Sequence, residues 1–182
     1  MFALTPRLTL RPGWPEDAPA LARAIGHEAV ATRLSRVPWP YTEEDAHWFL
    51  REAWREPGPV FLIAERGGGD RPIGCAGIHH EEGGPEFGYW LTPAVWGRGY
   101  ATEAGRAVVA IARDALRLPR LRSSYFTGND ASARVLAKLG FRPTGAVVRQ
   151  PSRALGREVD AVEMALELDV ACGGDGPLPL AA

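Results

Sequence analysis

The sequence predicts an α/β domain with a mixed sheet, in the element order β-α-α-β-β-β-α-β-α-β-β. A segment rich in aromatic and β-prone residues, 86–92, is followed by a glycine loop and then by an apolar pattern of helical period. Near both ends of the chain, around 8–10 and at 162–168, apolar residues alternate with polar ones, as they do in half-buried strands. A strand–loop–helix unit set between alternating strands is typical of an α/β sheet.

Composition indicates an ordinary globular chain: 182 residues, 46% hydrophobic, 24% charged, with a net charge of −1. This length predicts one domain, 1–172, and the Gly- and Pro-rich segment 173–182 is expected to be a disordered tail. The charge balance favours neither nucleic-acid nor membrane partners. The chain shows no signal-peptide pattern and no apolar run of membrane-spanning length, so a cytoplasmic location is expected. Cys75 and Cys172 form no disulfide or metal pattern, and no metal is expected.

The first strand and helix are defined by short signals. Leu8 and Leu10 alternate with polar neighbours, and Pro12 ends that strand. Asp17 is placed to cap a following helix, which Gly26 weakens or ends.

An irregular segment, 37–41, precedes the second helix because its two prolines exclude regular structure. Residues 42–45 read Thr-Glu-Glu-Asp, a capping box with Asp in place of Glu, and open that helix. Strands at 60–64 and 73–79 follow, joined by a hairpin-like turn at 67–70.

The C-terminal half is predicted to alternate helix and strand and to end in two strands. The expected elements are a helix at 101–116, a strand at 121–127, a helix capped by Asn129 that runs to about Leu139, and strands at 144–149 and 159–168.

The strand–loop–helix unit is suited to binding an anion. The first amides of a helix lack intrahelical partners, and the helix dipole adds positive potential there. Gly97 and Gly99 allow positive φ and a close approach of the backbone to a phosphate, and they expose the amides of 98–102. Taken alone, such a glycine pair is more commonly a simple turn.

Three motifs, in this order, resemble the GNAT acyltransferases. They are Glu-Phe-Gly-Tyr-Trp-Leu at 86–91, Trp-Gly-Arg-Gly-Tyr-Ala-Thr-Glu-Ala at 96–104, and Asn129-x-x-Ser132 running into Lys-Leu-Gly-Phe at 138–141. The arrangement is most similar to the branch of ribosomal-protein N-terminal acetyltransferases (RimJ/RimL-like). The resemblance spans almost the whole chain. It implies a GNAT-type, centrally splayed sheet flanked by helices, with a cofactor in the crevice where two strands separate.

That cofactor, by resemblance, is acetyl-CoA. Its pyrophosphate is expected on the amides of 98–102, and its pantetheine arm is expected to pair with the backbone of 89–92 like an added strand. Trp96 stands where the family usually has Gln or Arg and is equally explained as packing. The cofactor-binding residues expected are Tyr89, Trp90, Leu91, Thr92, Trp96, Gly97, Arg98, Gly99, Tyr100, Ala101, Thr102, Asn129 and Ser132.

Acyl transfer needs a donor for the oxyanion and one for the departing thiolate. The backbone amide of Leu91 is expected to serve the oxyanion. Many GNAT enzymes place a tyrosine acid at the position of Leu136, which cannot donate. Ser132 lies one turn earlier on the same helix face, and resemblance to the ribosomal-protein branch implies that its hydroxyl substitutes. For Asn129 and Ser132, helix capping is a compatible alternative.

Glu86, at the start of its strand, is the candidate catalytic base. Its alternative is a solvated carboxylate at a strand end. His79, His80 and a chain of water molecules are the other candidates. Glu103 suits the positive end of the helix dipole and is interpreted as structural.

The acceptor side is expected to combine an aromatic slot with arginines that attract an acidic acceptor, although packing and surface charge explain the same residues. They are Trp39, Tyr41 and Trp90 for the slot, and Arg33, Arg36 and Arg153 for the charge.

The sequence therefore predicts an acetyl-CoA-dependent N-acetyltransferase that acts on a primary amine by direct transfer in a ternary complex. The amine is expected on a protein N-terminus or a small molecule, and the enzyme is expected to be a monomer or homodimer. The alternative is a non-catalytic acyl-CoA-binding or sensor domain on the same fold. A Rossmann dinucleotide site is disfavoured because Thr102 stands where its third glycine would be.

Overall fold

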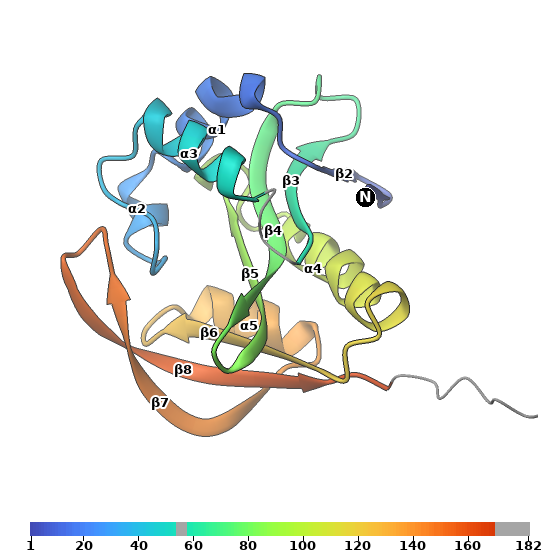
Figure 1. Ribbon diagram of the computed structural model, residues 1–182, viewed down its shortest axis with the longest axis vertical. Helices are drawn as coiled ribbons and strands as arrows, with labels where there is room; N and C mark the ends of the chain where they lie inside the picture. The colour runs from blue at the N-terminus through green and yellow to red at the C-terminus, as the bar shows by residue number, and fades with distance from the viewer. Residues whose placement is uncertain (54–57, 170–182) are drawn as a thin grey trace, which may run out of the picture.

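The computed structural model describes residues 1–53 and 58–169, which form one eight-stranded mixed sheet with helices on its faces (Figure 1). The sheet order is β1-β2-β3-β4-β5-β6-β8-β7. The strands are β1 (Ala3–Leu4), β2 (Leu8–Arg11), β3 (Val60–Glu65), β4 (Pro72–Glu81), β5 (Gly84–Leu91), β6 (Arg120–Phe126), β7 (Arg142–Ser152) and β8 (Arg157–Glu167). The helices are α1 (Ala18–Ile25), α2 (Glu28–Ala31), α3 (Glu43–Ala53), α4 (Tyr100–Ala110) and α5 (Asp130–Lys138). Short 3-10 turns lie at Pro15–Asp17 and Pro93–Val95, and a π-helical turn, Ile111–Ala115, extends α4.

The predicted fold class and element order are confirmed, with two additions. The two-residue strand β1 and the four-residue helix α2 are too short to show a period in the sequence. The last two strands are longer than predicted at their hairpin ends, and a register shift between Pro143 and Val147 interrupts their pairing. The predicted tail, 173–182, and Cys172 lie outside the described residues.

The sheet opens at its centre. All neighbouring strands pair antiparallel except β5 and β6, which pair in parallel at a single position, Glu86 with Arg122. Beyond it the Ser123 hydroxyl donates to the Phe87 carbonyl at 2.9 Å, and the two strands diverge (Figure 1). The crevice therefore opens along the second half of β5.

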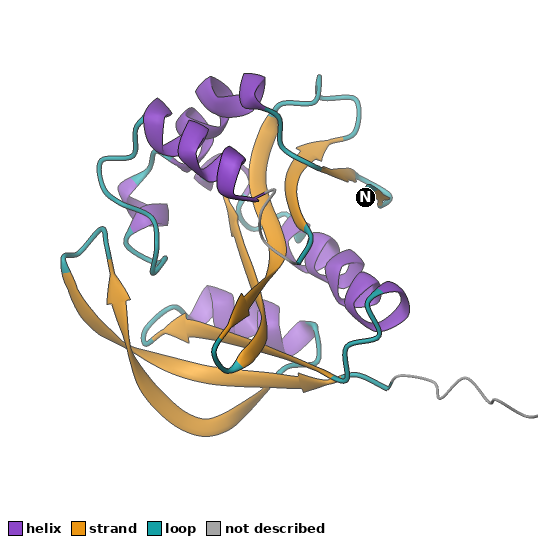
Figure 2. Cartoon of the chain, in the orientation of Figure 1, coloured by secondary structure: helices purple, strands orange, loops and turns teal. Residues whose placement is uncertain are grey.

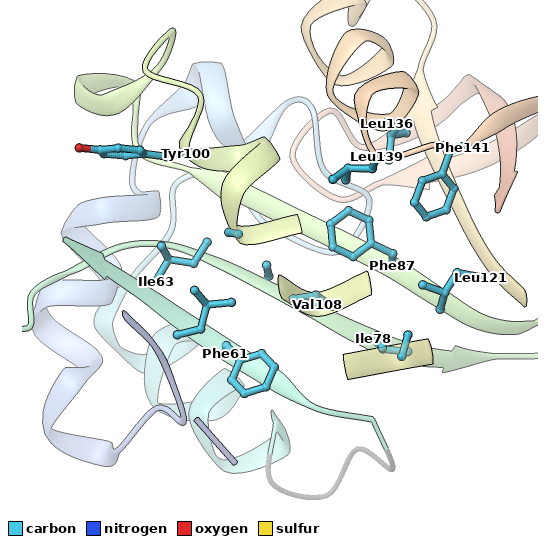
Figure 3. Close-up of a cluster of buried hydrophobic side chains, with 14 of the residues drawn as sticks. Phe61, Ile63, Ile78, Phe87, Tyr100, Val108, Leu121, Leu136, Leu139 and Phe141 are labelled. Atoms are coloured by element: carbon cyan, nitrogen blue, oxygen red, sulfur yellow. The ribbon is translucent and has the colours of Figure 1, made fainter. Parts of the chain in front are cut away.

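Two layers of helices cover the sheet (Figure 2). On one face, α4 and α5 enclose the main core, in which Leu136, Leu139 and Phe141 gather around Phe87 (Figure 3). On the other face, α1 and α3 pack over a smaller cluster that includes Leu62 and Cys75. Because β3 contributes to both clusters, its sequence is a continuous apolar run rather than an alternating one. Burial raises the pKa of the Cys75 thiol to about 12, as expected for a core cysteine.

The start of α3 is capped as predicted. The Thr42 amide donates to the Asp45 carboxylate at 2.9 Å, and the Asp45 amide donates to the Thr42 hydroxyl at 3.2 Å. The predicted capping role of the Asp17 side chain is wrong. That carboxylate instead accepts two hydrogen bonds of 2.7 Å from Arg11 and one from the Trp14 amide.

Electrostatics explain why the Asp17 carboxylate bonds to Arg11 rather than capping α1. Burial of Asp17 would raise its pKa, but the hydrogen bonds from Arg11 and from the Trp14 amide lower it below the ordinary value. A buried arginine requires such a partner, and Arg11 is almost fully enclosed.

Among residues 1–53 and 58–169, no helix combines the length and apolarity needed to cross a membrane.

Candidate active site

A cavity of about 420 Å³ lies where β5 and β6 separate. Its lining comes from α2 and the turn after it, β5, the glycine loop with the start of α4, β6, α5, and Gln150 of β7. The site is therefore assembled from both halves of the splayed sheet, and most of the predicted site residues meet in it.

The glycine loop has the predicted left-handed backbone. Gly97 has a φ of 76° and Gly99 a φ of 80°, and Gly99 occupies the N-cap position of α4. The Glu103 amide makes the first bond of helical type, to the Gly99 carbonyl at 3.0 Å. The amides of residues 100–102 precede it and have no acceptor of that type. No atom outside residues 96–98 lies within 4 Å of where a Gly97 side chain would begin, so the backbone here is open to a ligand.

Side chains outside the cavity hold the loop in place. Arg7 donates through Nη1 to the Arg98 carbonyl at 3.0 Å, and its guanidinium stacks 4.6 Å from the Tyr100 ring. The Tyr100 hydroxyl donates to Glu65 at 2.7 Å, and the Arg98 side chain is also directed to Glu65. Arg98 is therefore an anchor outside the lining, and only its backbone remains a candidate for cofactor contact.

Glu103 has the structural role that the sequence indicated. Its carboxylate accepts from the Thr5 hydroxyl at 2.6 Å and pairs with the Arg7 guanidinium at 2.6 Å. Burial would raise the pKa of Glu103, but these hydrogen bonds lower it. The start of α4 is thus fixed to the turn between β1 and β2.

The second half of β5 has an open hydrogen-bonding edge. The Thr92 amide donates to the Ile73 carbonyl of β4 at 2.8 Å, which sets the antiparallel register. In that register Trp90 bonds to β4, whereas the amides and carbonyls of Tyr89 and Leu91 point toward the crevice. The Leu91 amide is therefore directed as predicted. Thr92 lies outside the lining with its amide already bonded, which corrects its expected pairing with pantetheine.

Trp96 combines packing with a specific contact. Its Nε1 donates to the Leu91 carbonyl at 2.7 Å, and its ring lines the cavity. The Arg33 guanidinium lies 5.8 Å from the ring centre. Trp96 thus fixes the end of β5 and leaves the Leu91 amide facing the cavity.

The start of α5 brings three polar groups together. The Asn129 side chain accepts from the Ser132 amide at 3.3 Å and from Arg33 Nη1 at 3.2 Å. The Tyr89 hydroxyl donates to Ser132 Oγ at 3.1 Å. Leu136 has no exposed surface, packs in the main core and does not line the cavity.

Glu86 lies at the other end of the cavity. Its Oε1 is 3.2 Å from the Ser124 hydroxyl of β6, and Gln150 Nε2 donates to the same hydroxyl at 3.0 Å. His79 faces Glu86 across β4 and β5 but does not line the cavity, and His80 is exposed. Of the candidate bases, only Glu86 lines the site.

The predicted aromatic slot is not formed. Trp90 and Tyr41 both pack against the smaller core, but only Trp90 also lines the cavity, and Trp39 lies outside the lining. The sequence pattern does not reveal that Tyr41 is taken up by this core.

Of the three predicted arginines, only Arg33 lines the cavity. Arg36 pairs with Glu81 of β4, and the Arg153 amide donates to the Ser35 carbonyl at 3.0 Å. Arg36 thus joins the turn after α2 to β4, and Arg153 joins the β7–β8 hairpin to the same turn.

Two cations of α5, Arg134 and Lys138, also line the cavity, and sequence reasoning missed them. Arg134 and Lys138 are four residues apart and share a helix face, but their spacing from Ser132 does not place them beside it, so helical period alone gives no signal for them.

Comparisons with known proteins agree with this geometry. The family described as "Acetyltransferase (GNAT) domain" matches residues 7–142. The chain is 32% identical over 152 residues to the uncharacterized N-acetyltransferase YoaA of Bacillus subtilis (strain 168), covering 80% of this chain and 85% of YoaA. It is also 32% identical over 170 residues to the uncharacterized N-acetyltransferase p20 of Bacillus licheniformis, covering 89% and 93%.

Among solved structures, the fold is similar to that of RimL, a ribosomal alpha-N-protein acetyltransferase in complex with coenzyme A. The TM-score is 0.78 at 18% identity, over 93% of this chain and 99% of RimL.

Proposed function

The chain belongs to the GNAT acetyltransferase family, and from that premise we propose that it transfers an acetyl group from acetyl-CoA to a primary amine. The observation that carries this proposal is the pairing, in one cavity, of an open strand edge at Tyr89 and Leu91 with a left-handed glycine loop at the start of α4. The strand edge suits a peptide-like arm, and the loop suits a pyrophosphate.

The donor set fits acetyl-CoA. The amides of residues 100–102 would hold the pyrophosphate, and the backbone groups of Tyr89 would pair with pantetheine amides. Arg134 and Lys138 add positive charge to the same cavity. Bound acetyl-CoA supplies an activated acyl thioester.

Three groups of the chain have chemical roles in this proposal. The Leu91 amide donates to the developing oxyanion, and Ser132 donates to the departing sulfur. Glu86 receives the proton that the amine loses. Because Glu86 precedes Leu91 by five residues, ~17 Å along an extended strand, that proton travels through water. Two of the candidate bases, Glu86 and water, thus act together in this proposal: water carries the amine proton, and Glu86 accepts it.

Direct transfer to the amine is proposed because the described cavity offers no thiol nucleophile. Cys75, the free cysteine within residues 1–53 and 58–169, is buried in the smaller core, and its thiol has a raised pKa. Initial rates with both substrates varied are expected to give intersecting lines. Parallel lines with an acetylated enzyme detected by mass spectrometry would contradict direct transfer.

The acceptor is proposed to be a protein N-terminus or an amine-bearing small molecule. The resemblance to RimL supports the first at the level of the fold. The proposals of a cytoplasmic location and of a monomer or homodimer stay predictions.

A screen tests the function. The protein is incubated with acetyl-CoA and a panel of N-terminal peptides, amino acids, polyamines and aminoglycosides, and release of free CoA thiol is measured with mass spectrometry of the product. Amine-dependent release with a mass gain of one acetyl group is expected. Tight acetyl-CoA binding in calorimetry without release for any amine would favour the alternative, a non-catalytic acyl-CoA-binding domain.

A further inference from the structure

The phenol of Tyr89 contacts Ser132, the residue that the proposed function assigns to the leaving sulfur. Its hydroxyl donates to Ser132 Oγ at 3.1 Å, joining β5 to α5 across the cavity. Both residues line the cavity. The sequence pattern assigned Tyr89 only a backbone role, so its side chain is a group that the mechanism above does not use.

Packing fixes the position of this phenol. The Tyr89 ring stacks on Phe87 with a centroid distance of 5.6 Å and an interplanar angle of 23°. Phe87 stacks in turn on Phe141 at 5.9 Å, inside the main core. A ring held on a rigid strand and by a stack of aromatic rings has few alternative rotamers, so its hydroxyl is held toward α5.

The 3.1 Å contact allows either hydroxyl to donate. When Tyr89 donates and Ser132 accepts, the Ser132 proton is left for another partner. Within residues 1–53 and 58–169, the hydrogen bond of the Ser132 hydroxyl is the one with Tyr89. A ligand atom in the cavity is therefore the natural acceptor for that proton.

We propose that Tyr89 is a positioning residue for acyl transfer, which acts through Ser132 to make the serine hydroxyl a stronger and directed hydrogen-bond donor to the CoA sulfur. This inference rests on the proposed function. Many GNAT enzymes place a phenol at the helix position of Leu136. In this proposal the phenol comes instead from Tyr89 of the central strand, and it acts on the sulfur indirectly, through Ser132.

Relative acidities decide what the pair does. A phenol has a pKa of about 10 and a thiol of about 8.5, so proton transfer from Tyr89 toward a thiolate is uphill. Burial raises the pKa of Tyr89 further, and its hydrogen bond with Ser132 only partly offsets this. The two hydroxyls therefore keep their protons and act by hydrogen bonding.

The atoms balance without an acid from the protein. The carbon–sulfur bond of the thioester breaks, and its electron pair stays on sulfur, stabilised by the Ser132 proton. The new carbon–nitrogen bond releases one proton from the amine, which leaves through water toward Glu86. The sulfur takes its proton from water when free CoA departs.

The test measures the acidity of bound CoA and needs no acceptor amine. The thiolate absorbance of the protein–CoA complex is followed against pH, with the complex of desulfo-CoA, which lacks the sulfur, as the blank. Wild type is expected to bind a thiol more acidic than that of free CoA. Tyr89→Phe is expected to lower the acid dissociation constant of the bound thiol roughly 3- to 10-fold, the scale of one hydrogen bond.

A double-mutant cycle separates action through Ser132 from a general effect. Ser132→Ala is expected to weaken the acidity more than Tyr89→Phe, and adding Tyr89→Phe to Ser132→Ala is expected to change nothing further. Arg33, Arg134, Lys138 and Glu86 also line the cavity, but their charges are the same in all variants.

Tyr41→Phe is the matched control because it removes a half-buried phenol outside the cavity, and it is expected to leave the acidity of the bound thiol unchanged. Unchanged acidity in Tyr89→Phe, with normal CoA affinity by calorimetry, would overturn this inference alone. Failure of the wild-type protein to bind CoA would overturn the proposed function and this inference with it.

Discussion

The two ends of the cavity are built in different ways. The glycine-loop end consists of backbone groups from one continuous segment, 97–102, held by side chains that lie outside the cavity. The other end, proposed above to receive the acceptor, consists of side chains from separate elements, with Glu86 on β5, Ser124 on β6 and Gln150 on β7. A cofactor end made of backbone tolerates many side chains, whereas an acceptor end made of side chains changes with each substitution.

The sharpest way to break this comparison is to add a side chain to the backbone end. Gly99→Val places a branched residue at a φ of 80° and removes at least two amide–phosphate bonds, so acetyl-CoA affinity is expected to fall about 100-fold or more. Calorimetry measures the affinity, and thermal unfolding checks that the fold is retained.

Gly67→Val is the matched control, since Gly67 also has a φ of 80° but lies in the β3–β4 turn. Both variants are expected to lose about 1–2 kcal/mol of stability from the strained backbone, and only Gly99→Val is expected to lose affinity. Equal affinity in the two variants would remove the phosphate assignment.

At the acceptor end, Glu86→Gln keeps the size of the side chain and removes its charge. Turnover is expected to fall about 100-fold, the usual scale of general-base catalysis, with acetyl-CoA affinity nearly unchanged. Rates across the pH range, with the best amine from the screen, measure the effect. A near-normal rate at every pH would assign the proton route to water alone.

Trp96 lies between the two ends and sharpens the comparison. Trp96→Phe keeps an aromatic ring but removes the hydrogen bond from Nε1 to the Leu91 carbonyl. The KM for acetyl-CoA is expected to rise about 3-fold, the scale of one hydrogen bond. The kcat is expected to fall by a similar factor, because the Leu91 amide loses its fixed position. A change in amine KM alone would contradict this role.

The smallest effect is expected at the loop's outer anchor. Glu103→Gln weakens the contact with Arg7, whose side chain is half exposed, so affinity for acetyl-CoA is expected to fall only about 2-fold.

Because the folded-state pKa of Glu103 is lowered, the carboxylate's contribution to stability is present above its unfolded pKa and is lost as pH falls through the folded value. Acid unfolding of Glu103→Gln is therefore expected to show a weaker pH dependence than wild type.

The same contrast explains what the sequence predicts well. The glycine loop, the Thr42–Asp45 capping box and the Asn129 cap each depend on residues within four positions of one another, so local spacing reveals them. The fold class follows from local patterns: helical period in the long helices, alternation in strands such as β2 and β8, and a continuous apolar run in β3. These features need no knowledge of which distant elements meet.

Several misses depend on tertiary contacts. The Asp17 side chain bonds to Arg11, six residues earlier, because a buried guanidinium needs a carboxylate, and Tyr41 packs against the smaller core. The contact of Tyr89 with Ser132 joins residues 43 positions apart. Alternation along β5 places Tyr89 on the face of Phe87, but only the packing of α5 brings Ser132 to it.

The single parallel contact between β5 and β6 has a consequence for the whole molecule. Where β5 and β6 separate, the sheet lacks a stretch of interstrand hydrogen bonds. A peptide-like ligand that lies between the two strands would supply hydrogen bonds there. Occupancy of the crevice is then linked to global stability: at a ligand concentration 100 times the Kd, the native state gains about 2.7 kcal/mol. Binding and resistance to heat become two measurements of one equilibrium, so a melting curve alone can rank acyl-CoA ligands before any acceptor is known.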